Sequence, residues 1–493
     1  MAGATREEII AAIRADAASL PQGSLADGGA GVVIGFIDQD GLDYRLPATR
    51  LGAGTRLLAL WDTLGEDNAL EPDNPADPYV EYYGGRYSTT EIEGALAGGS
   101  PLPVTLKAKS HGHAVLDLAA GPSGLAPKSD LVFVSLPNLT EPIITPYRPP
   151  AGVISAETEV SSYGDLTELS QALIYIFNLA DERPCVVNVS MGATDGPHDG
   201  TSTFDETITR LVNERPNRAV VISAGNYADD EHLHGELHLM EGEATSFVFR
   251  LEDNDRGYEL DLWYSGADEL EFTLESPDGD MFGPFPPGTS QDFRDRTGVE
   301  SHVWHQLMPR NGSHQFNVNF AVGVTANDWL VHVIPNRVSA GRVNAWLYPE
   351  TGARLELPGG ISLVGLACCE NAIVVGAHDH STGQAAFFSG RGPTRDGRKK
   401  PDLCAPGVEL DINVGASFMT AWGTSYSAPL VTGAVALMLA EAQRRGLQLR
   451  AAEVRAILTT TADAPAGWDL ENGAGHLDVG SALRTIIDRA DRR

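Results

Sequence analysis

The sequence is poor in cysteine, in lysine and in long apolar runs. Its four cysteines, Cys185, Cys368, Cys369 and Cys404, show neither a disulfide framework nor the spacing of metal ligands. Nothing in this cysteine content requires an oxidising compartment. No run of 18 or more apolar residues occurs, so no membrane-spanning helix is predicted.

Positive charge is also scarce. Only five of the 35 basic residues are lysines, and 67 acidic residues give a formal net charge of −32. Such a chain repels nucleic acid and anionic membranes, so neither is expected as a partner. The first residues lack a basic segment followed by an apolar stretch, the mark of a secretory signal. We therefore expect a cytoplasmic protein, whose oligomeric state the sequence does not indicate.

The most informative stretch is Trp-Gly-Thr-Ser-Tyr-Ser-Ala-Pro at residues 422–429, which precedes a long helical pattern of small and apolar residues. Ser425 stands in a tight turn at the start of this helix. Free N–H groups and a partial positive charge there favour a developing oxyanion. Serine and threonine are also common helix caps, so this motif alone fits a structural role as well.

A serine nucleophile needs a base and a carboxylate that orients the base. The apolar run 31–37 predicts a strand buried on both faces, and Asp38 follows it at the edge where α/β folds keep their ligand crevice. His111 precedes a glycine and a small-residue helix pattern. Either residue alone would be read as a turn or a satisfied polar group. The order Asp, His, Ser is the order found in subtilisin.

On these three motifs the chain resembles a subtilisin-like serine protease, of the branch with a jelly-roll insertion that includes spore-germination proteases. The resemblance covers residues 28–226 and about 362–493. It implies Asp38 as the orienting carboxylate, His111 as the base and Ser425 as the nucleophile. The histidine motif departs from the family pattern at its third and fourth positions, which leaves His113 as a rival base.

Further segments extend the resemblance. The strand pattern from residue 218 ends in Ala-Gly-Asn, so Asn226 is expected to form the oxyanion hole with the Ser425 N–H. Residues 186–192 resemble the strand whose edge pairs with the substrate backbone. By the same resemblance, the substrate-binding residues are Ser190, Met191, Gly192, Ser223, Ala224 and Gly225.

The resemblance implies an endopeptidase that hydrolyses protein or peptide substrates through an acyl-enzyme intermediate. No cofactor is required and no metal ligand is assigned; structural calcium occurs in many relatives, but the sequence does not place a site. One alternative is a catalytically silent protease fold that binds peptides, which the unusual His-Gly-His-Ala sequence favours. A second is an esterase or peptide ligase using the same site.

The predicted fold class is α/β, a subtilisin-like mostly parallel sheet flanked by helices, with an inserted antiparallel β-sandwich that is jelly-roll-like. The expected domains are an N-terminal helical extension (1–27), the catalytic domain in two parts (28–226 and 362–493) and the inserted sandwich (227–361). Six segments of the insertion alternate apolar and polar residues, which indicates strands. These are 246–251, 258–264, 270–274, 315–320, 329–334 and 342–347. The sandwich is interpreted as a brace, or alternatively as an exosite that selects substrates.

Two helices are predicted outside the catalytic motifs. Thr5 to Leu20 suggests one amphipathic helix with Ile9, Ile10, Ile13 and Ala17 on a face. Residues 87–96 suggest another, with Ser88 and Glu91 at the spacing of a capping box.

Overall fold

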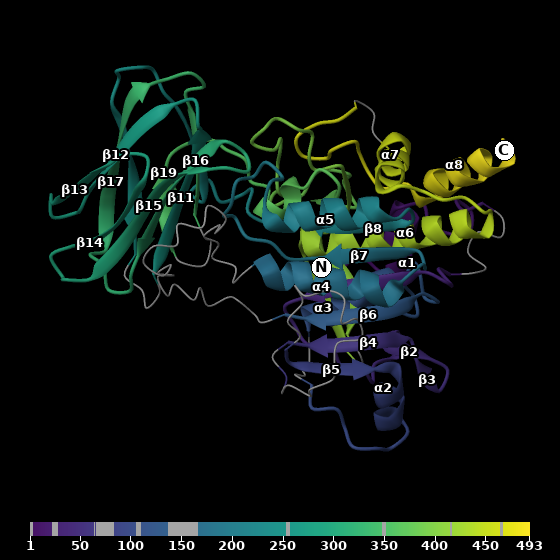
Figure 1. Ribbon diagram of the computed structural model, residues 1–493. Helices are drawn as coiled ribbons and strands as arrows, with labels where there is room; N and C mark the ends of the chain where they lie inside the picture. The colour runs from purple at the N-terminus through teal and green to yellow at the C-terminus, as the bar shows by residue number, and fades with distance from the viewer. Residues whose placement is uncertain are drawn as a thin grey trace.

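The computed structural model shows two bodies side by side (Figure 1). It describes residues 3–21, 28–63, 65, 83–104, 110–136, 166–252, 257–347, 352–414, 417–463 and 467–493. One body holds a mostly parallel sheet flanked by helices, and the other holds two antiparallel sheets. The predicted fold class is confirmed; the jelly-roll connectivity stays a prediction. The predicted end of the N-terminal extension, at residue 27, lies outside the described residues.

The central sheet has eight strands. In chain order they are β1 (Val33–Asp38), β4 (Leu57–Asp62), β5 (Gly85–Ser88), β6 (Asp130–Ser135), β7 (Cys185–Val189), β8 (Arg218–Ser223), β20 (Ile373–His378) and β21 (Leu403–Pro406). Across the sheet the order is β21-β20-β8-β7-β1-β6-β4-β5. All neighbours are parallel except β4 and β5. The carboxyl ends of the parallel strands therefore meet at one edge, where α/β folds bind ligands.

Helices pack on both faces of this sheet. The elements on one side are α3 (His111–Ala120), α6 (Thr424–Arg444) and α8 (Val479–Asp491), and those on the other are α4 (Leu166–Ala180) and α5 (Thr203–Glu214). In β1, Ile34 and Phe36 join the first cluster, whereas Val33 and Ile37 join the second. Successive strand residues point to opposite faces, so an unbroken apolar run is what a doubly covered strand needs.

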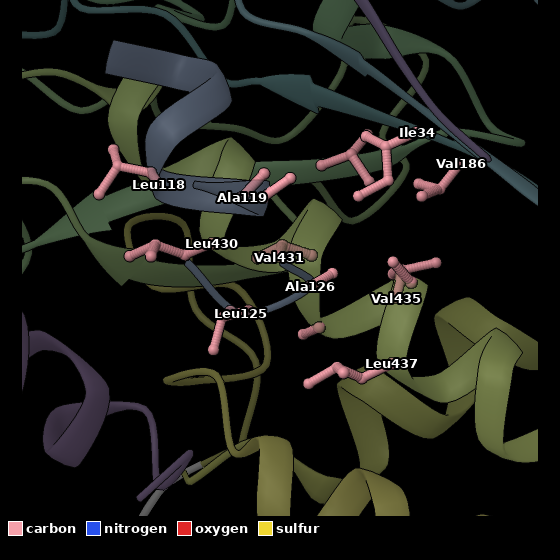
Figure 2. Close-up of a cluster of buried hydrophobic side chains, with 14 of the residues drawn as sticks. Ile34, Leu118, Ala119, Leu125, Ala126, Val186, Leu430, Val431, Val435 and Leu437 are labelled. Carbon is pink, nitrogen blue, oxygen red and sulfur yellow. The ribbon is translucent and has the colours of Figure 1, made fainter. Parts of the chain in front are cut away.

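Helix α6 lies inside the molecule. Figure 2 shows its side chains Leu430, Val431 and Val435 in one cluster with Leu118 of α3 and with Ile34 and Val186 of the sheet. Among the described helices, α6 alone is long and apolar enough to cross a membrane. However, 89% of its most apolar window is buried inside the protein. Its composition therefore follows from its place in the core.

The second body consists of two facing antiparallel sheets. One contains, in spatial order, β13 (Met281–Phe285), β12 (Glu269–Glu275), β17 (Asn327–Arg337), β10 (Thr245–Leu251) and β19 (Arg354–Glu356). The other contains β14 (Thr289–Arg294), β15 (Glu300–Met308), β16 (Ser313–Phe320), β11 (Tyr258–Ser265), β18 (Arg342–Leu347) and β9 (His234–His238). Alternate residues such as Phe249 of β10 and Phe316 of β16 fill the core between the sheets. All six segments predicted as strands are strands.

The sandwich contacts the catalytic half at residues 194–199, the loop that continues from β7. The Gly196 N–H donates to Asp261 Oδ2 of β11 at 3.0 Å. The His198 ring stacks on Trp346 of β18, with centroids 3.9 Å apart. Asp261, His198 and Trp346 are all buried, so these contacts hold the loop against the sandwich.

The N-terminal helix is shorter than the sequence predicts. Helix α1 (Arg6–Ala12) ends well before Leu20, and Ala17 is exposed, so the long amphipathic helix is wrong. Arg14 leaves the helical conformation with φ 53, and its guanidinium forms an ion pair with Asp478 at 2.7 Å. A tertiary contact with the distant C-terminal segment thus overrides the local pattern.

The second predicted helix is confirmed. Helix α2 (Thr89–Leu96) begins after Ser88, which forms a capping box with Glu91. The remaining elements are short or lie at the periphery. They are α7 (Ala451–Thr461) and the two-stranded pairs β2 (Arg50–Leu51) with β3 (Gly54–Thr55) and β22 (Leu410–Val414) with β23 (Ser417–Ala421).

A buried ion pair supports the edge of the central sheet. Lys400 Nζ lies 2.6 Å from Asp402 Oδ2 and donates to Ala372 O at 2.8 Å. We expect Lys400→Met to lower the free energy of unfolding by about 3–5 kcal/mol, because the Asp402 carboxylate would stay buried without its cation. Chemical denaturation measures this change. Lys399→Met, at the exposed neighbour, should cost about 1 kcal/mol or less, and equal losses in both variants would contradict the assignment.

Candidate active site

Asp38 and His111 form a hydrogen-bonded pair at the carboxyl edge of the sheet. Asp38 is the last residue of β1 and is 1% exposed. Its Oδ2 lies 2.8 Å from Nδ1 of His111, the first residue of α3. A carboxylate only accepts, so Nδ1 carries the proton and Nε2 is left as an acceptor. The pair is therefore in the tautomer that a general base requires.

The backbone of His111 is held separately. Its N–H donates to Asp40 Oδ2 at 2.8 Å, and Ser110, which caps α3, donates its hydroxyl to Gly41 O at 2.8 Å. Gly112 lets the helix approach the acid, because a Cβ there would lie 2.6 Å from the Phe133 ring. The loop after β1 thus holds the first residues of α3, which carry the His111 imidazole, through these two hydrogen bonds.

Burial lowers the pKa of His111, but the charge and hydrogen bond of Asp38, with the charge of Asp40, outweigh it and leave the pKa raised. The imidazolium is therefore stabilised relative to an isolated histidine. A base of raised pKa is neutral only at correspondingly higher pH. Activity that needs neutral His111 should therefore rise with pH.

His113, the rival base, is engaged elsewhere. Its Nε2 accepts the Asp43 backbone N–H at 2.6 Å, and its side chain is buried. Burial lowers its pKa, and the opposing charges of Asp43 and Asp38 do not restore it. This ring supports the loop after β1, so the geometry favours His111 as the base.

Ser425 is the second residue of α6. Gly423 precedes the helix with φ 146, a conformation that favours glycine. The ring of the next residue, Tyr426, lies 5.4 Å from the His111 ring. The Ser425 hydroxyl donates to Ser190 O at 3.2 Å, and the Ser190 hydroxyl donates to Ser425 O at 2.9 Å. The nucleophile candidate is thus tied to the predicted substrate strand in this structure.

Asn226 follows β8 and faces the same helix start. Its Oδ1 accepts the Thr424 N–H at 2.8 Å and the Thr424 hydroxyl at 2.9 Å. An N–H can only donate, so the oxygen end must face Thr424 and the Nδ2 end must face away. A Cβ at Gly423 would lie 3.4 Å from that Nδ2. The amide donor therefore lies next to the turn that carries Ser425, as an oxyanion donor should.

The sequence reasoning missed several supporting residues. Thr424 is fully buried, and its hydroxyl also accepts the Gly225 N–H at 3.1 Å. Asn188 of β7 donates to the Ser190 hydroxyl at 2.8 Å and accepts from Thr432 of α6 at 2.9 Å. A polar residue inside an apolar strand, as in Val-Val-Asn-Val, was the signal that could have indicated this network.

The predicted substrate-binding residues lie on two adjacent segments. Ser190, Met191 and Gly192 follow β7, and Ser223, Ala224 and Gly225 end or follow β8. Because β7 and β8 pair in parallel, both segments leave the sheet at the same edge as Asp38. The predicted site residues thus lie on neighbouring segments at one edge of the sheet, although the Ser425 hydroxyl donates to Ser190 O and not to His111.

Metal ligands and cysteine pairs give no further site. Within the described ranges, no group of three or more His, Cys, Asp or Glu side chains is arranged to hold a metal ion. All four cysteines are buried and free. The expectation of structural calcium therefore stays a prediction.

Comparison with known proteins places this geometry in context. A family model described as the subtilase family matches residues 345–475. The structure of the Clostridium perfringens CspB protease superposes with a TM-score of 0.75 at 24% identity, over 96% of this chain and 97% of that one. The chain has a subtilisin-like fold.

Two curated relatives of this subtilisin-like chain come from Bacillus subtilis strain 168. Bacillopeptidase F is 29% identical over 249 residues, which are 43% of this chain and 17% of that protein. Serine protease AprX is 32% identical over 133 residues, which are 23% of this chain and 29% of that protein. The chain thus spans less than a third of the length of either relative.

Proposed function

We propose that the chain is a serine endopeptidase that cleaves peptide bonds in protein or peptide substrates. The observation that carries this proposal is the 2.8 Å hydrogen bond between Asp38 and His111 Nδ1, beside the helix start that bears Ser425. The resemblance to proteases of the subtilase family supports the same reaction class. The chemistry uses side chains, backbone N–H groups and water.

In the first half of the reaction, His111 Nε2 takes the proton of the Ser425 hydroxyl as the oxygen attacks the scissile carbonyl carbon. The carbonyl oxygen becomes an oxyanion, which accepts hydrogen bonds from Asn226 Nδ2 and the Ser425 N–H. Asp38 stabilises the imidazolium that forms. His111 then gives the proton to the leaving amine, and the acyl group stays on Ser425.

In the second half, water replaces the amine. His111 removes a proton from water as its oxygen attacks the acyl carbon, and the same donors hold the second oxyanion. Collapse of this intermediate breaks the bond to Ser425 and returns the proton to its oxygen. The products are a carboxylic acid and the free enzyme.

The substrate is proposed to bind as an extended strand. Residues 190–192 leave β7 at the site edge and offer backbone groups to such a strand. The side chain before the cut enters between residues 190–192 and residues 223–225, which form the two walls of the proposed pocket. In the free protein the Ser425 hydroxyl is bonded to Ser190 O at 3.2 Å. Binding must therefore turn this hydroxyl toward His111, as catalytic hydrogen bonds often tighten only in the complex.

The oxyanion assignment predicts a loss of turnover without a loss of binding. Asn226→Ala should lower kcat about 10²- to 10³-fold with little change in KM; this magnitude was measured on a subtilisin. Asn226→Asp should lose a similar amount, because it keeps the acceptor for Thr424 but removes the donor. Steady-state kinetics on a peptide substrate measure both variants.

Asn371→Ala is the matched control. This asparagine donates to Thr209 at 3.0 Å and precedes β20, at the opposite edge of the sheet from the site. Its kcat should equal that of the unaltered protein. If Asn226→Asp kept full turnover, the oxyanion role of Asn226 would be rejected. The roles of Asp38, His111 and Ser425 would not be affected by that result.

A further inference from the structure

Val364 fills the space between the two predicted walls of the substrate pocket. A Cβ added at Gly192 would lie 2.5 Å from Val364 Cγ2, and one added at Gly225 would lie 2.5 Å from Val364 Cγ1. The two methyl groups therefore occupy the positions toward which side chains on both walls would point. One valine thus closes the gap between the segments that follow β7 and β8.

The burial of the walls agrees with a filled gap. Ser190 is 4% exposed, Met191 9%, Ala224 0% and Val364 itself 1%, and of the six wall residues Gly192 alone is partly exposed. A deep pocket open to solvent would leave its lining accessible to water. The space available to a substrate side chain between these walls is therefore shallow.

Backbone hydrogen bonds fix Val364 in this position. Its N–H donates to Ala224 O at 3.0 Å, and the N–H of Gly365 donates to Ala193 O at 2.8 Å. One bond reaches each wall. The valine therefore cannot move away without breaking the contacts that hold the two walls together.

Residues of the inserted sandwich belong to the same buried cluster as the valine. Val364 shares a buried cluster with Trp263 of β11 and Trp346 of β18. Close-packed interiors resist added volume, so the packing of this cluster limits how far the valine can retreat from a substrate. The insertion thus contacts the pocket through the segment by which the chain returns from it.

We infer that Val364 sets the size of this pocket and restricts cleavage to sites after small side chains, glycine, alanine and serine. This inference rests on the proposed function, because it concerns the substrate of the same site. A leucine or phenylalanine before the cut would need the volume that the valine methyl groups occupy. A single methylene in a hydrophobic pocket changes kcat/KM about 10- to 200-fold.

The test is a series of peptides that differ only in the residue before the cut, alanine, leucine or phenylalanine. The unaltered protein should cleave the alanine peptide with a kcat/KM at least about tenfold above that for phenylalanine. Val364→Gly should raise kcat/KM for leucine and phenylalanine by about 10- to 200-fold and change alanine less. Val364→Leu should lower cleavage of the alanine peptide.

Val374→Ala is the matched control, because Val374 of β20 is fully buried in the same cluster. It should leave the ratio of the three rates unchanged. A preference of the unaltered protein for leucine or phenylalanine would overturn the inference, and so would an equal shift in the Val374 variant. The unaltered protein suffices for the first comparison, so the inference remains testable even if Val364→Gly does not fold.

Labelling by a fluorophosphonate separates this inference from the proposed function. The probe reacts with an activated serine and places no large side chain between the walls. Labelling of Ser425 together with cleavage after large residues would overturn only the role of Val364. Absence of labelling would instead overturn the serine hydrolase mechanism.

Discussion

Ser425→Ala is expected to abolish peptide cleavage, with a fall in kcat of about 10⁶-fold. The variant lacks the oxygen that forms the acyl-enzyme, and a loss of this size was measured when the nucleophile of a subtilisin was removed. Fluorophosphonate labelling should disappear together with hydrolysis. Both are measured on purified protein, by mass spectrometry and by steady-state cleavage of a peptide.

Ser427→Ala provides the matched control on the same helix. The Ser427 hydroxyl is fully buried and donates to Pro406 O at 3.1 Å, so it contacts no substrate. This variant should keep both labelling and cleavage. Unchanged cleavage in Ser425→Ala would reject the mechanism. If the unaltered protein bound peptides but was not labelled by the fluorophosphonate, the catalytically silent, peptide-binding alternative would be favoured instead.

Asp38→Asn is expected to lower kcat by about 10⁴-fold without disturbing the fold. Asparagine can offer its N–H to His111 Nδ1, which places the imidazole proton on Nε2 and removes the acceptor that Ser425 needs. The amide also lacks the charge that stabilises the imidazolium. Steady-state kinetics measure the loss, and an unchanged melting temperature would separate it from unfolding.

The same substitution should also change the pH dependence of activity. In the unaltered protein Asp38 helps to raise the pKa of His111, so activity should rise with pH through a value above that of a free histidine. Without the charge this pKa falls, and the acidic limb of the residual activity should move to lower pH. A movement to higher pH, or none, would contradict the pairing.

Asp43→Asn controls for a general loss of negative charge near the site. The Asp43 carboxylate forms an ion pair with Arg45 at 2.8 Å, while its backbone N–H binds His113. The substitution keeps that N–H and removes a carboxylate that acts on Arg45 and on the pKa of His113, whereas the pKa of His111 is raised by Asp38 and Asp40. Turnover and the pH limb should therefore match those of the unaltered protein.

Local patterns indicated where the candidate site residues lie because each motif stands at the start or end of a helix or strand. Asp38 ends an apolar run that had to be a buried strand, and Gly423 precedes a helix whose small residues suit the core. The sandwich strands were predictable because one face of each is buried. In these cases the local sequence and the tertiary structure favour the same conformation.

Contacts between distant segments were not predictable in this way. The early end of α1 depends on Arg14 meeting Asp478, 464 residues later. The hydroxyl of Thr424 meets residues about 200 positions away, and Val364 reaches both pocket walls from the far side of an insertion. The sequence pattern of one segment does not indicate which distant residues will contact it in the folded protein.

The strand order has a consequence for how such a protein could arise. β8 and β20 are direct neighbours, with Val221 opposite Ile373, although the whole sandwich lies between them along the chain. The chain leaves β8 and returns to the adjacent parallel strand β20, so the eight-stranded sheet would keep the same strand order around a plain crossover of about a dozen residues or more. Insertion of the sandwich between β8 and β20 would therefore leave the strand pairing of the sheet unchanged.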